Sequence, residues 1–371
     1  MKLCHLADSH LGAGENHARR GTTGLTVRQE DIISSFVEAI DRIIAVRPDI
    51  CIHAGDLFHV VRPLNRIMAI AGEHLYRLAA ENGIPTVIIA GNHDAPRQPH
   101  VGAALDVYRQ IPNLFVATGG TMSQFTVGEA CITALPHCQT VADQKDQLEL
   151  CRPDPDARHN VLVLHGVASG MPEFSMADLG EQELPLDLMA RFDYTALGHF
   201  HNHCQVAPTA WYSGSTERLS QSEREADKGF LEVDLLPLKV QFHAVATRPM
   251  IDLSTIDAAG RRGDQVVAEI KQHLEAAGST DKIVRVKIEG VTEEVLKTLP
   301  AEALAELKRE TFSLDVRFEK AKDTDENNQF GQAAVGRLDQ GFIQYLESVD
   351  LKGFDRDRLV TEALKYLKAD E

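Results

Sequence analysis

The chain has 371 residues, which is more than one hydrophobic core usually organises, so we expect two domains. Its formal net charge is −17, which argues against nucleic-acid binding through the protein's own Lys and Arg side chains unless bound cations supply local positive charge. The six cysteines form no Cys-x-x-Cys pair, the N-terminus lacks the apolar stretch of a signal peptide, and no apolar run approaches the roughly 20 residues of a membrane helix, so we expect a cytoplasmic protein with no membrane contact.

The first hundred residues alternate between expected strands and helices. Apolar runs predict strands at residues 3–7, 49–54 and 86–90, and apolar residues at helical spacing predict helices at about 32–44 and 64–80. Such alternation is typical of βαβ units with parallel strands, which places the chain in the α/β class. Further strands are expected at residues 131–135, 161–164, 194–197, 230–235 and 241–246.

The pattern changes near residue 248 and predicts a small α/β module. A helix at about 264–276, a strand at 283–288, a helix at about 292–309 and a strand at 313–318 follow one another. Residues 323–329 are polar and acidic, as in a linker, and two helical patterns continue after them. We therefore expect a main domain at 1–248, a small domain at 249–322, and a linker with a helical tail at 323–371.

Side chains of types that bind metals follow five of the expected strands. They form four short motifs and one isolated histidine: Asp8-Ser9-His10, Gly55-Asp56-Leu57-Phe58-His59, Gly91-Asn92-His93-Asp94, Gly198-His199-Phe200-His201, and His165. Ligands of α/β sheets gather beyond the carboxyl ends of the strands, so we expect these side chains to meet. The glycines are expected to allow sharp exits and close backbone approach. An Asp-x-His or His-x-His on an extended segment would point both side chains to the same side.

Seven of these residues are candidate metal ligands. They are Asp8, His10, Asp56, Asn92, His165, His199 and His201. One ion takes about four to six ligands, so seven suit two ions that share a bridging group, and Asp56 is the best-placed carboxylate to bridge. Carboxylate, imidazole and amide ligands suit manganese, iron or zinc, and the lack of a thiolate argues against a structural zinc site. Two ions held in this way clamp a phosphoryl group and activate water for in-line attack.

The ordered set of motifs resembles the calcineurin-like metallophosphoesterases, and within them the SbcD-type nucleases of DNA double-strand-break repair. The second motif reads Gly-Asp-Leu-Phe-His, where protein Ser/Thr phosphatases carry Gly-Asp-x-x-Asp-Arg-Gly. Residues 211–218 and the run Lys228-Gly229-Phe230 resemble the nucleases' Tyr-Pro-Gly-Ser…Arg…Lys-Gly-Phe, with Ser213 in place of the proline. The resemblance implies a four-layer α/β/β/α sandwich with a small α/β capping domain and a helical C-terminal tail. It also implies exonuclease or endonuclease activity, or both.

The resemblance further implies a role for each motif residue. One ion would be held by Asp8, His10, Asp56 and His201, and the other by Asp56, Asn92, His165 and His199. The ions would be manganese. The leaving oxygen would be protonated, or the scissile phosphate contacted, by His93, with His59 assisting and Asp94 orienting a histidine.

The family's partners follow from the same resemblance. It implies a DNA substrate, an SMC-like ATPase subunit of the SbcC type docked by the tail, and a homodimer formed through helices near residues 64–80. Apolar residues occupy more than one face of that expected helix. Loop arginines near the motifs could form a positive rim for the DNA backbone or a solvated surface: Arg19, Arg20, Arg28, Arg62, Arg66, Arg97, Arg218 and Arg224.

Two other functions are compatible with the motifs. The first is a metallophosphoesterase that acts on small phosphodiesters or phosphoproteins, against which residues 211–218 and 228–230 and the small domain argue. The second is a non-catalytic scaffold with a relic metal site, whose expected sign is missing ligands. None of the seven ligands is missing from the sequence.

Overall fold

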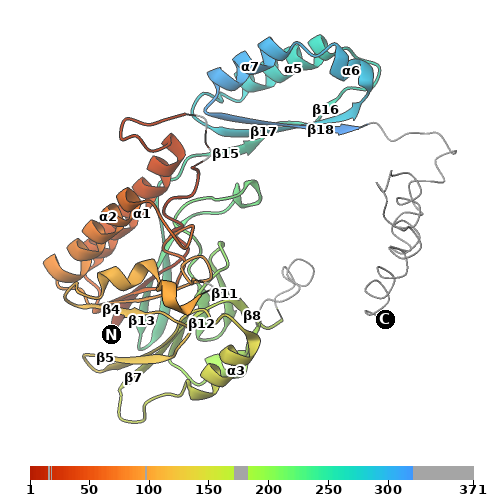
Figure 1. Cartoon of the computed structure of the whole chain (residues 1–371). Helices are drawn as coiled ribbons and strands as arrows, with labels where there is room; N and C mark the ends of the chain where they lie inside the picture. Colours follow the sequence, from red (N-terminus) through yellow and green to blue (C-terminus); the bar gives the residue numbers. More distant parts are fainter. Residues whose placement is uncertain (16, 18, 97, 171–182, 321–371) are drawn as a thin grey trace, which may run out of the picture.

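The computed structural model describes residues 1–15, 17, 19–96, 98–170 and 183–320 (Figure 1). Two six-stranded mixed sheets make the main body, and a four-stranded sheet with its own helices forms a separate unit, at the top of Figure 1. The expected linker and helical tail at 323–371 lie outside the described residues. Within those residues, no helix is both long and apolar enough to cross a membrane.

The first sheet carries the predicted βαβ units. Its order is β14-β13-β1-β2-β3-β4, with bounds β1 (Lys2–Leu6), β2 (Ile50–His53), β3 (Thr86–Ile89), β4 (Leu114–Ala117), β13 (Gly229–Leu235) and β14 (Leu238–Ala244). Strands β1 to β4 are parallel, and β13 pairs antiparallel with both β1 and β14. The connections contain the helices α1 (Val27–Val46) and α2 (Asn65–Tyr76). A π-helical turn, η1 (Arg77–Glu81), extends α2. The strands and helices predicted in the first hundred residues are confirmed.

The second sheet has the order β11-β12-β10-β7-β6-β5. Its strands are β5 (Ser123–Val127), β6 (Ala130–Leu135), β7 (His159–His165), β10 (Tyr194–Gly198), β11 (Cys204–Ala207) and β12 (Ala210–Tyr212). The inner strands are parallel, and the edge strands β5 and β11 are antiparallel to their neighbours. Shorter elements complete this part of the chain: α3 (Val141–Leu150), α4 (Leu186–Met189), the pair β8 (Val167–Ala168) and β9 (Glu183–Leu184), and the 3-10 turns η2 (Pro99–Val101), η3 (Ala104–Tyr108) and η5 (Gln221–Glu223).

Alternation along the strands divides the core of the main body into layers. In β1, Leu3 lies in the core between the two sheets, whereas its neighbour Cys4 packs with residues of α1 and α2. In β7, Val161 lies in the same inner core, and Leu162 packs with Leu188 of α4 on the outer face of the second sheet. Helices therefore cover the outer face of each sheet, which confirms the α/β/β/α sandwich.

Residues 250–320 form the separate unit, which we call the C-terminal unit. Its parallel sheet is built around β17 (Ile283–Val291) from β15 (Met250–Asp252), β16 (Ile256–Asp257) and β18 (Ser313–Lys320). Helices α5 (Gly263–Ala276), α6 (Glu293–Lys297) and α7 (Ala301–Glu310) cover one face and enclose a core of their own (Figure 1). The single helix predicted at 292–309 is wrong, because Pro300 disfavours helical backbone at the residue before it and is the N-cap of α7.

Side-chain contacts join the C-terminal unit to the sandwich. Arg248 donates to both carboxylate oxygens of Asp31 in α1 at 2.6 and 2.7 Å, and its guanidinium lies 3.7 Å from the ring centroid of Phe312. His17 stacks on Phe312 with centroids 4.7 Å apart, and Arg19 donates to main-chain carbonyls at the end of α7. The loop that follows His10 therefore reaches the C-terminal unit.

Several arginines expected on a DNA-binding rim have other contacts. Arg28 donates to the carbonyl oxygen of Arg218, and Arg218 in turn donates to the hydroxyl of Thr247. Arg224 pairs with Asp252 at 3.3 Å. These three side chains hold the polypeptide together near the junction, and the positive rim stays a prediction.

Candidate metal centre

Loops at the carboxyl ends of strands in both sheets carry the candidate ligands. Strands β1, β2 and β3 lead into Asp8, Asp56 and Asn92, while β7 ends at His165 and β10 leads into His199. Main-chain hydrogen bonds of 2.8–3.0 Å join residues 8–11 to residues 55–57. Both sheets therefore deliver these side chains to one place.

Four candidate ligands have left-handed backbone. The φ angle is 52° at Asp8, 43° at His10, 54° at Asp56 and 102° at His199. Non-glycine residues rarely adopt this conformation, which costs about 1–2 kcal/mol and persists where neighbouring contacts hold it. Since β1 ends at Leu6, the expectation that Asp8 and His10 converge by alternation along an extended segment is wrong. A left-handed turn brings them together instead.

Three glycines let the loops approach more closely than any side chain would permit. A Cβ on Gly91 would lie 2.2 Å from Oδ1 of Asp56, and one on Gly55 would lie 2.3 Å from Nδ1 of His165. A Cβ on Gly198 would lie 2.0 Å from a main-chain carbonyl oxygen before the Asp56 loop. Close approach was expected of these glycines, and Gly55 also makes a left-handed turn, with φ of 100°.

The carboxylate of Asp56 lies at the centre of the group. Its Oδ2 is 3.6 Å from Nε2 of His10 and 3.4 Å from Nε2 of His165. Its Oδ1 accepts the main-chain NH of His93 at 2.8 Å. One oxygen is thus placed near imidazoles delivered by two different sheets, and the other is held by backbone. A bridging carboxylate would have this arrangement.

One set of donor atoms comes from Asp8, His10 and His201. Nε2 of His10 and Nε2 of His201 are 3.1 Å apart. Two nitrogens that each lie about 2.1 Å from a shared ion, at an angle of about 90–109°, are about 3.0–3.4 Å apart. Donor atoms of all three residues lie within 4.8 Å of one another. This set fits a divalent ion.

A second set comes from Asn92, His165 and His199. Oδ1 of Asn92 is 2.9 Å from Nε2 of His165 and 3.2 Å from Nδ1 of His199. Nδ1 of His165 donates to the carbonyl oxygen of Ala54 at 2.8 Å, which leaves Nε2 as its ligand atom. Donor atoms of Asp8, Asp56 and His165 also lie within 4.8 Å of one another, so the two sets meet at the aspartates.

Burial and neighbouring charges act in opposite directions on the ionisable groups here. Burial is the largest influence on Asp56 and opposes its ionisation, yet His165, His10 and His93 together hold the pKa of that carboxyl well below its usual range. Burial lowers the pKa of His165, but Asp56 and Asp8 outweigh it and raise that pKa to about 9. Burial raises the pKa of Asp8. Two buried carboxyl groups side by side need nearby positive charge, which bound cations supply.

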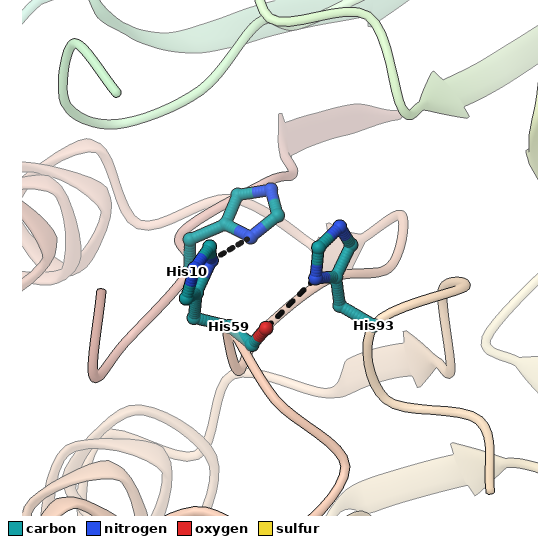
Figure 2. Close-up of side chains that lie close together, drawn as sticks. All are labelled: His10, His59 and His93. Atoms are coloured by element: carbon teal, nitrogen blue, oxygen red, sulfur yellow. Dashed lines mark hydrogen bonds between the residues drawn. The ribbon is translucent and has the colours of Figure 1, made fainter. Parts of the chain in front are cut away.

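His93 and His59 lie beside His10 (Figure 2). Nδ1 of His93 donates to the carbonyl oxygen of His59 at 2.7 Å, and the two rings stack with centroids 5.3 Å apart. Because a carbonyl oxygen only accepts, the proton is on Nδ1 of His93, and its Nε2 is left for another partner. His59 thus supports His93 through its main chain as well as its ring. Donor atoms of the three histidines also lie within 4.8 Å of one another, so the expected roles of His93 at the leaving oxygen and of His59 as its assistant stay predictions.

The carboxylate of Asp94 bonds to main-chain NH groups of two loops. Among the described residues, none of its hydrogen bonds is with a histidine. Its Oδ1 accepts the NH of Phe58 at 2.9 Å, and its Oδ2 accepts the NH groups of Leu57 and Gly91 at 3.0 and 3.2 Å. Burial, followed by the charge of Asp56, raises the pKa of Asp94 to about 7. The three hydrogen bonds join the Asp56 loop to the Asn92 loop, and the expected role of Asp94 in orienting a histidine stays a prediction.

Two buried charged residues near His201 were missing from the predicted site. Nδ1 of His201 lies 3.1 Å from Oε1 of Glu223, and Oε2 of Glu223 accepts from Nζ of Lys228 at 2.6 Å. The run Lys228-Gly229-Phe230 was a sequence signal for Lys228, but no motif marked Glu223.

Comparisons with known proteins agree with this geometry. Residues 1–215 match the sequence profile of the family described as calcineurin-like phosphoesterase. Proteins named "DNA double-strand break repair protein Mre11" are similar: that of Methanococcus maripaludis is 30% identical over 63% of this chain and 63% of its own length. The Haloferax volcanii protein is 28% identical over 79% of this chain and 62% of its own length. The Saccharolobus solfataricus protein is 24% identical over 100% of this chain and 96% of its own length. The matches to the first three such relatives span 49–63% of the relatives' lengths.

Proposed function

Because the chain belongs to the calcineurin-like phosphoesterase family, we propose that it is a DNA nuclease that hydrolyses phosphodiester bonds at a centre of two divalent ions. The observation that carries the proposal is the position of Asp56 Oδ2, within 3.6 Å of Nε2 of His10 and 3.4 Å of Nε2 of His165. We propose the ligand sets expected from the sequence, with Asp56 shared between them. The mixture of carboxylate, imidazole and amide donors suits manganese.

In this proposal, side chains of the protein position the reacting groups and supply a proton to the leaving group. When bound, two ions polarise the phosphoryl group and activate water for attack. The main-chain carbonyl of His59 holds Nδ1–H of His93 and turns Nε2 outward, so that Nε2 of the protonated ring can donate a proton to the leaving sugar oxygen or bind the scissile phosphate. Asp94 keeps the loops of Asp56 and Asn92 together, which keeps His93 beside the ligands.

DNA is the substrate that the relatives favour, since their shared name places them in DNA double-strand break repair. The net charge of −17 requires that positive charge be local. Cations in the centre would supply part of it, and two exposed arginines, Arg62 before α2 and Arg66 in its first turn, would supply more. We propose that the C-terminal unit, which contacts the loop that follows His10, acts as the expected cap.

The proposed assembly is a homodimer that works with an SMC-like ATPase. Apolar side chains are exposed at both ends of α2: Leu64, at its N-terminal cap, is 55% exposed and Tyr76, at its last residue, is 47% exposed. These exposed apolar side chains favour a second copy at this helix. We propose that residues 323–371 dock the ATPase, as the sequence resemblance implies.

One assay tests the function directly. Purified protein with manganese should cleave labelled single- or double-stranded DNA, and a chelator should abolish the cleavage. The alternative, a phosphoesterase for small phosphodiesters or phosphoproteins, predicts hydrolysis of an aryl phosphodiester or a phosphopeptide with no cleavage of DNA. Light scattering of the same preparation reports whether the chain is dimeric.

A further inference from the structure

The loop that ends in Lys228 wraps beneath the candidate ligand His201. A Cβ on Gly214 would lie 2.8 Å from the carbonyl oxygen of His201, and the NH of Ser215 donates to that same carbonyl at 3.0 Å. The loop residues Ser213, Ser215 and Thr216 are completely buried. This stretch is part of the nuclease-like motif, and its Gly214 and Ser215 contact the ligand loop inside the protein.

Lys228 is fully buried, and all three of its ammonium protons have acceptors. Nζ donates to Oε2 of Glu223 at 2.6 Å, to the carbonyl oxygen of His201 at 2.7 Å and to the hydroxyl of Ser215 at 3.0 Å. Its side chain has 0% exposure. A buried ammonium is costly unless it is paired and fully hydrogen-bonded, so this position fixes each of its acceptors tightly.

Glu223 connects this lysine to the ring of His201. Its Oε1 accepts from Nδ1 of His201 at 3.1 Å and from the hydroxyl of Ser220 at 2.9 Å. The ammonium of Lys228, 2.6 Å from Oε2, favours the ionised form of this carboxyl. An ionised carboxylate only accepts, so His201 keeps its proton on Nδ1, and Nε2 faces Nε2 of His10.

We propose that Glu223 is a positioning residue for His201, and that Lys228 fixes Glu223 and the main chain of His201 as one unit. The unit sets the affinity of the ion site formed by Asp8, His10 and His201. This inference rests on the proposed two-ion centre and deepens it. A carboxylate bound to the far nitrogen of a ligand histidine orients the ring and makes its ligand nitrogen more basic.

The two proposed ion sites differ in what binds Nδ1 of their histidines: His201 has the carboxylate of Glu223. His165, in the other site, has Nδ1 bound to the neutral carbonyl oxygen of Ala54. Removal of the Glu223 charge should therefore weaken the binding of one ion and leave the binding of the other unchanged. A general loosening of the fold would affect both.

Glu223→Gln is the test, because glutamine has nearly the same shape and lacks the charge. Manganese binding to the full chain is measured by calorimetry, and the coupling between the two ions by electron paramagnetic resonance. We expect two ions in the unmodified protein. In the variant, we expect one of the two affinities to fall about 10–100-fold, with a mononuclear spectrum at limiting manganese.

Glu217→Gln is the matched control. Glu217 lies in the same loop and is also buried, but its carboxylate contacts Arg28 at 3.4 Å, Ser35 at 3.1 Å and the main-chain NH of Arg218 at 2.7 Å. Among the described residues it contacts no candidate ligand. Its variant should lower the unfolding temperature and keep both manganese affinities. Lys228→Met should reproduce the single weak site, and combining it with Glu223→Gln should add little, because the two act as one unit.

The possible outcomes separate the two proposals. Fewer than two ions in the unmodified protein would contradict the proposed centre itself. Two ions in the unmodified protein, with both affinities retained within twofold in Glu223→Gln, would overturn the positioning role alone. Equal weakening in Glu223→Gln and Glu217→Gln would also overturn it, because the effect would then be one of loop stability.

Discussion

The main-chain NH of His93 donates to Oδ1 of Asp56 at 2.8 Å. The residue proposed to bridge the ions is thereby joined to the residue proposed to serve the leaving group. Only Oδ2 of Asp56 is left to face His10 and His165, at 3.6 and 3.4 Å. A displacement of Asp56 should therefore disturb metal binding and the position of His93 together.

Asp56→Asn should lose bound metal as well as activity. The NH of His93 requires an acceptor, so the amide oxygen of the new side chain should turn toward it, and the NH2 group should occupy the position of Oδ2. A donor group there repels cations. Elemental analysis measures the metal content, and Asp41→Asn, an exposed carboxylate on α1, serves as the control. Two tightly held ions in Asp56→Asn would refute the bridging assignment.

Gly91→Ala should damage the centre without a backbone penalty. The new Cβ would lie 2.2 Å from Oδ1 and 2.5 Å from the main-chain nitrogen of Asp56, so Asp56 must move. We expect manganese affinity to fall at least tenfold. Gly83→Ala is the control, since Gly83 has φ of 64° and open space around it. That variant should lose about 1 kcal/mol of stability and no metal affinity. Unchanged affinity in Gly91→Ala would show that the close approach of the two loops is not needed.

Sequence reasoning located the candidate ligands because each follows a strand, and strand ends depend on local pattern. The strands leading to Asp8, Asp56 and Asn92 lie where the apolar runs predicted them. The manner of convergence was not predictable. Left-handed backbone at Asp8 and Asp56 is held by contacts with distant loops, and no local preference of aspartate requires it.

Residues that act through tertiary contacts were harder to find. Glu223 is 22 positions from His201 in the sequence and joins it only because the loop between them folds back. Arg28 and Arg218 could have been DNA contacts, yet they bind carbonyl and hydroxyl groups at the junction with the C-terminal unit. The break at Pro300 is different, because a proline rule applied to the sequence would have predicted it.

His59→Ala should reduce activity modestly. His59 supports His93 through its carbonyl oxygen, which alanine also has. The variant loses only the stacked ring and the 3.4 Å contact between Nδ1 of His59 and Nδ1 of His10. A lost ring pair is worth about 0.5–1.5 kcal/mol, so turnover should fall about 2–10-fold. Cleavage of labelled DNA under saturating manganese measures this loss. A variant that loses an ion would show that His59 is a ligand.

His93→Ala should separate chemistry from binding. The leaving group is a sugar oxygen of high pKa, which needs a proton or a cation as it departs. The carbonyl of His59 keeps the proton of His93 on Nδ1, so Nε2 of the protonated ring can supply that proton. General acid catalysis is worth about 10²–10⁴-fold, or roughly 3–5 kcal/mol of barrier. Turnover on DNA should fall by that factor, while metal content and DNA affinity stay nearly unchanged.

A substrate with a good leaving group decides what His93 does. Nitrophenolate departs without a proton, so hydrolysis of a nitrophenyl phosphodiester should be affected far less by His93→Ala than cleavage of DNA. His59→Ala provides the matched control, because it removes a neighbouring imidazole and keeps the His93 ring with its carbonyl partner. If both substrates suffer equally in His93→Ala, His93 binds the phosphate and does not protonate the leaving group. If the variant loses an ion, His93 is a ligand. The donor atoms of His10, His59 and His93, which lie within 4.8 Å of one another, then form part of the metal centre.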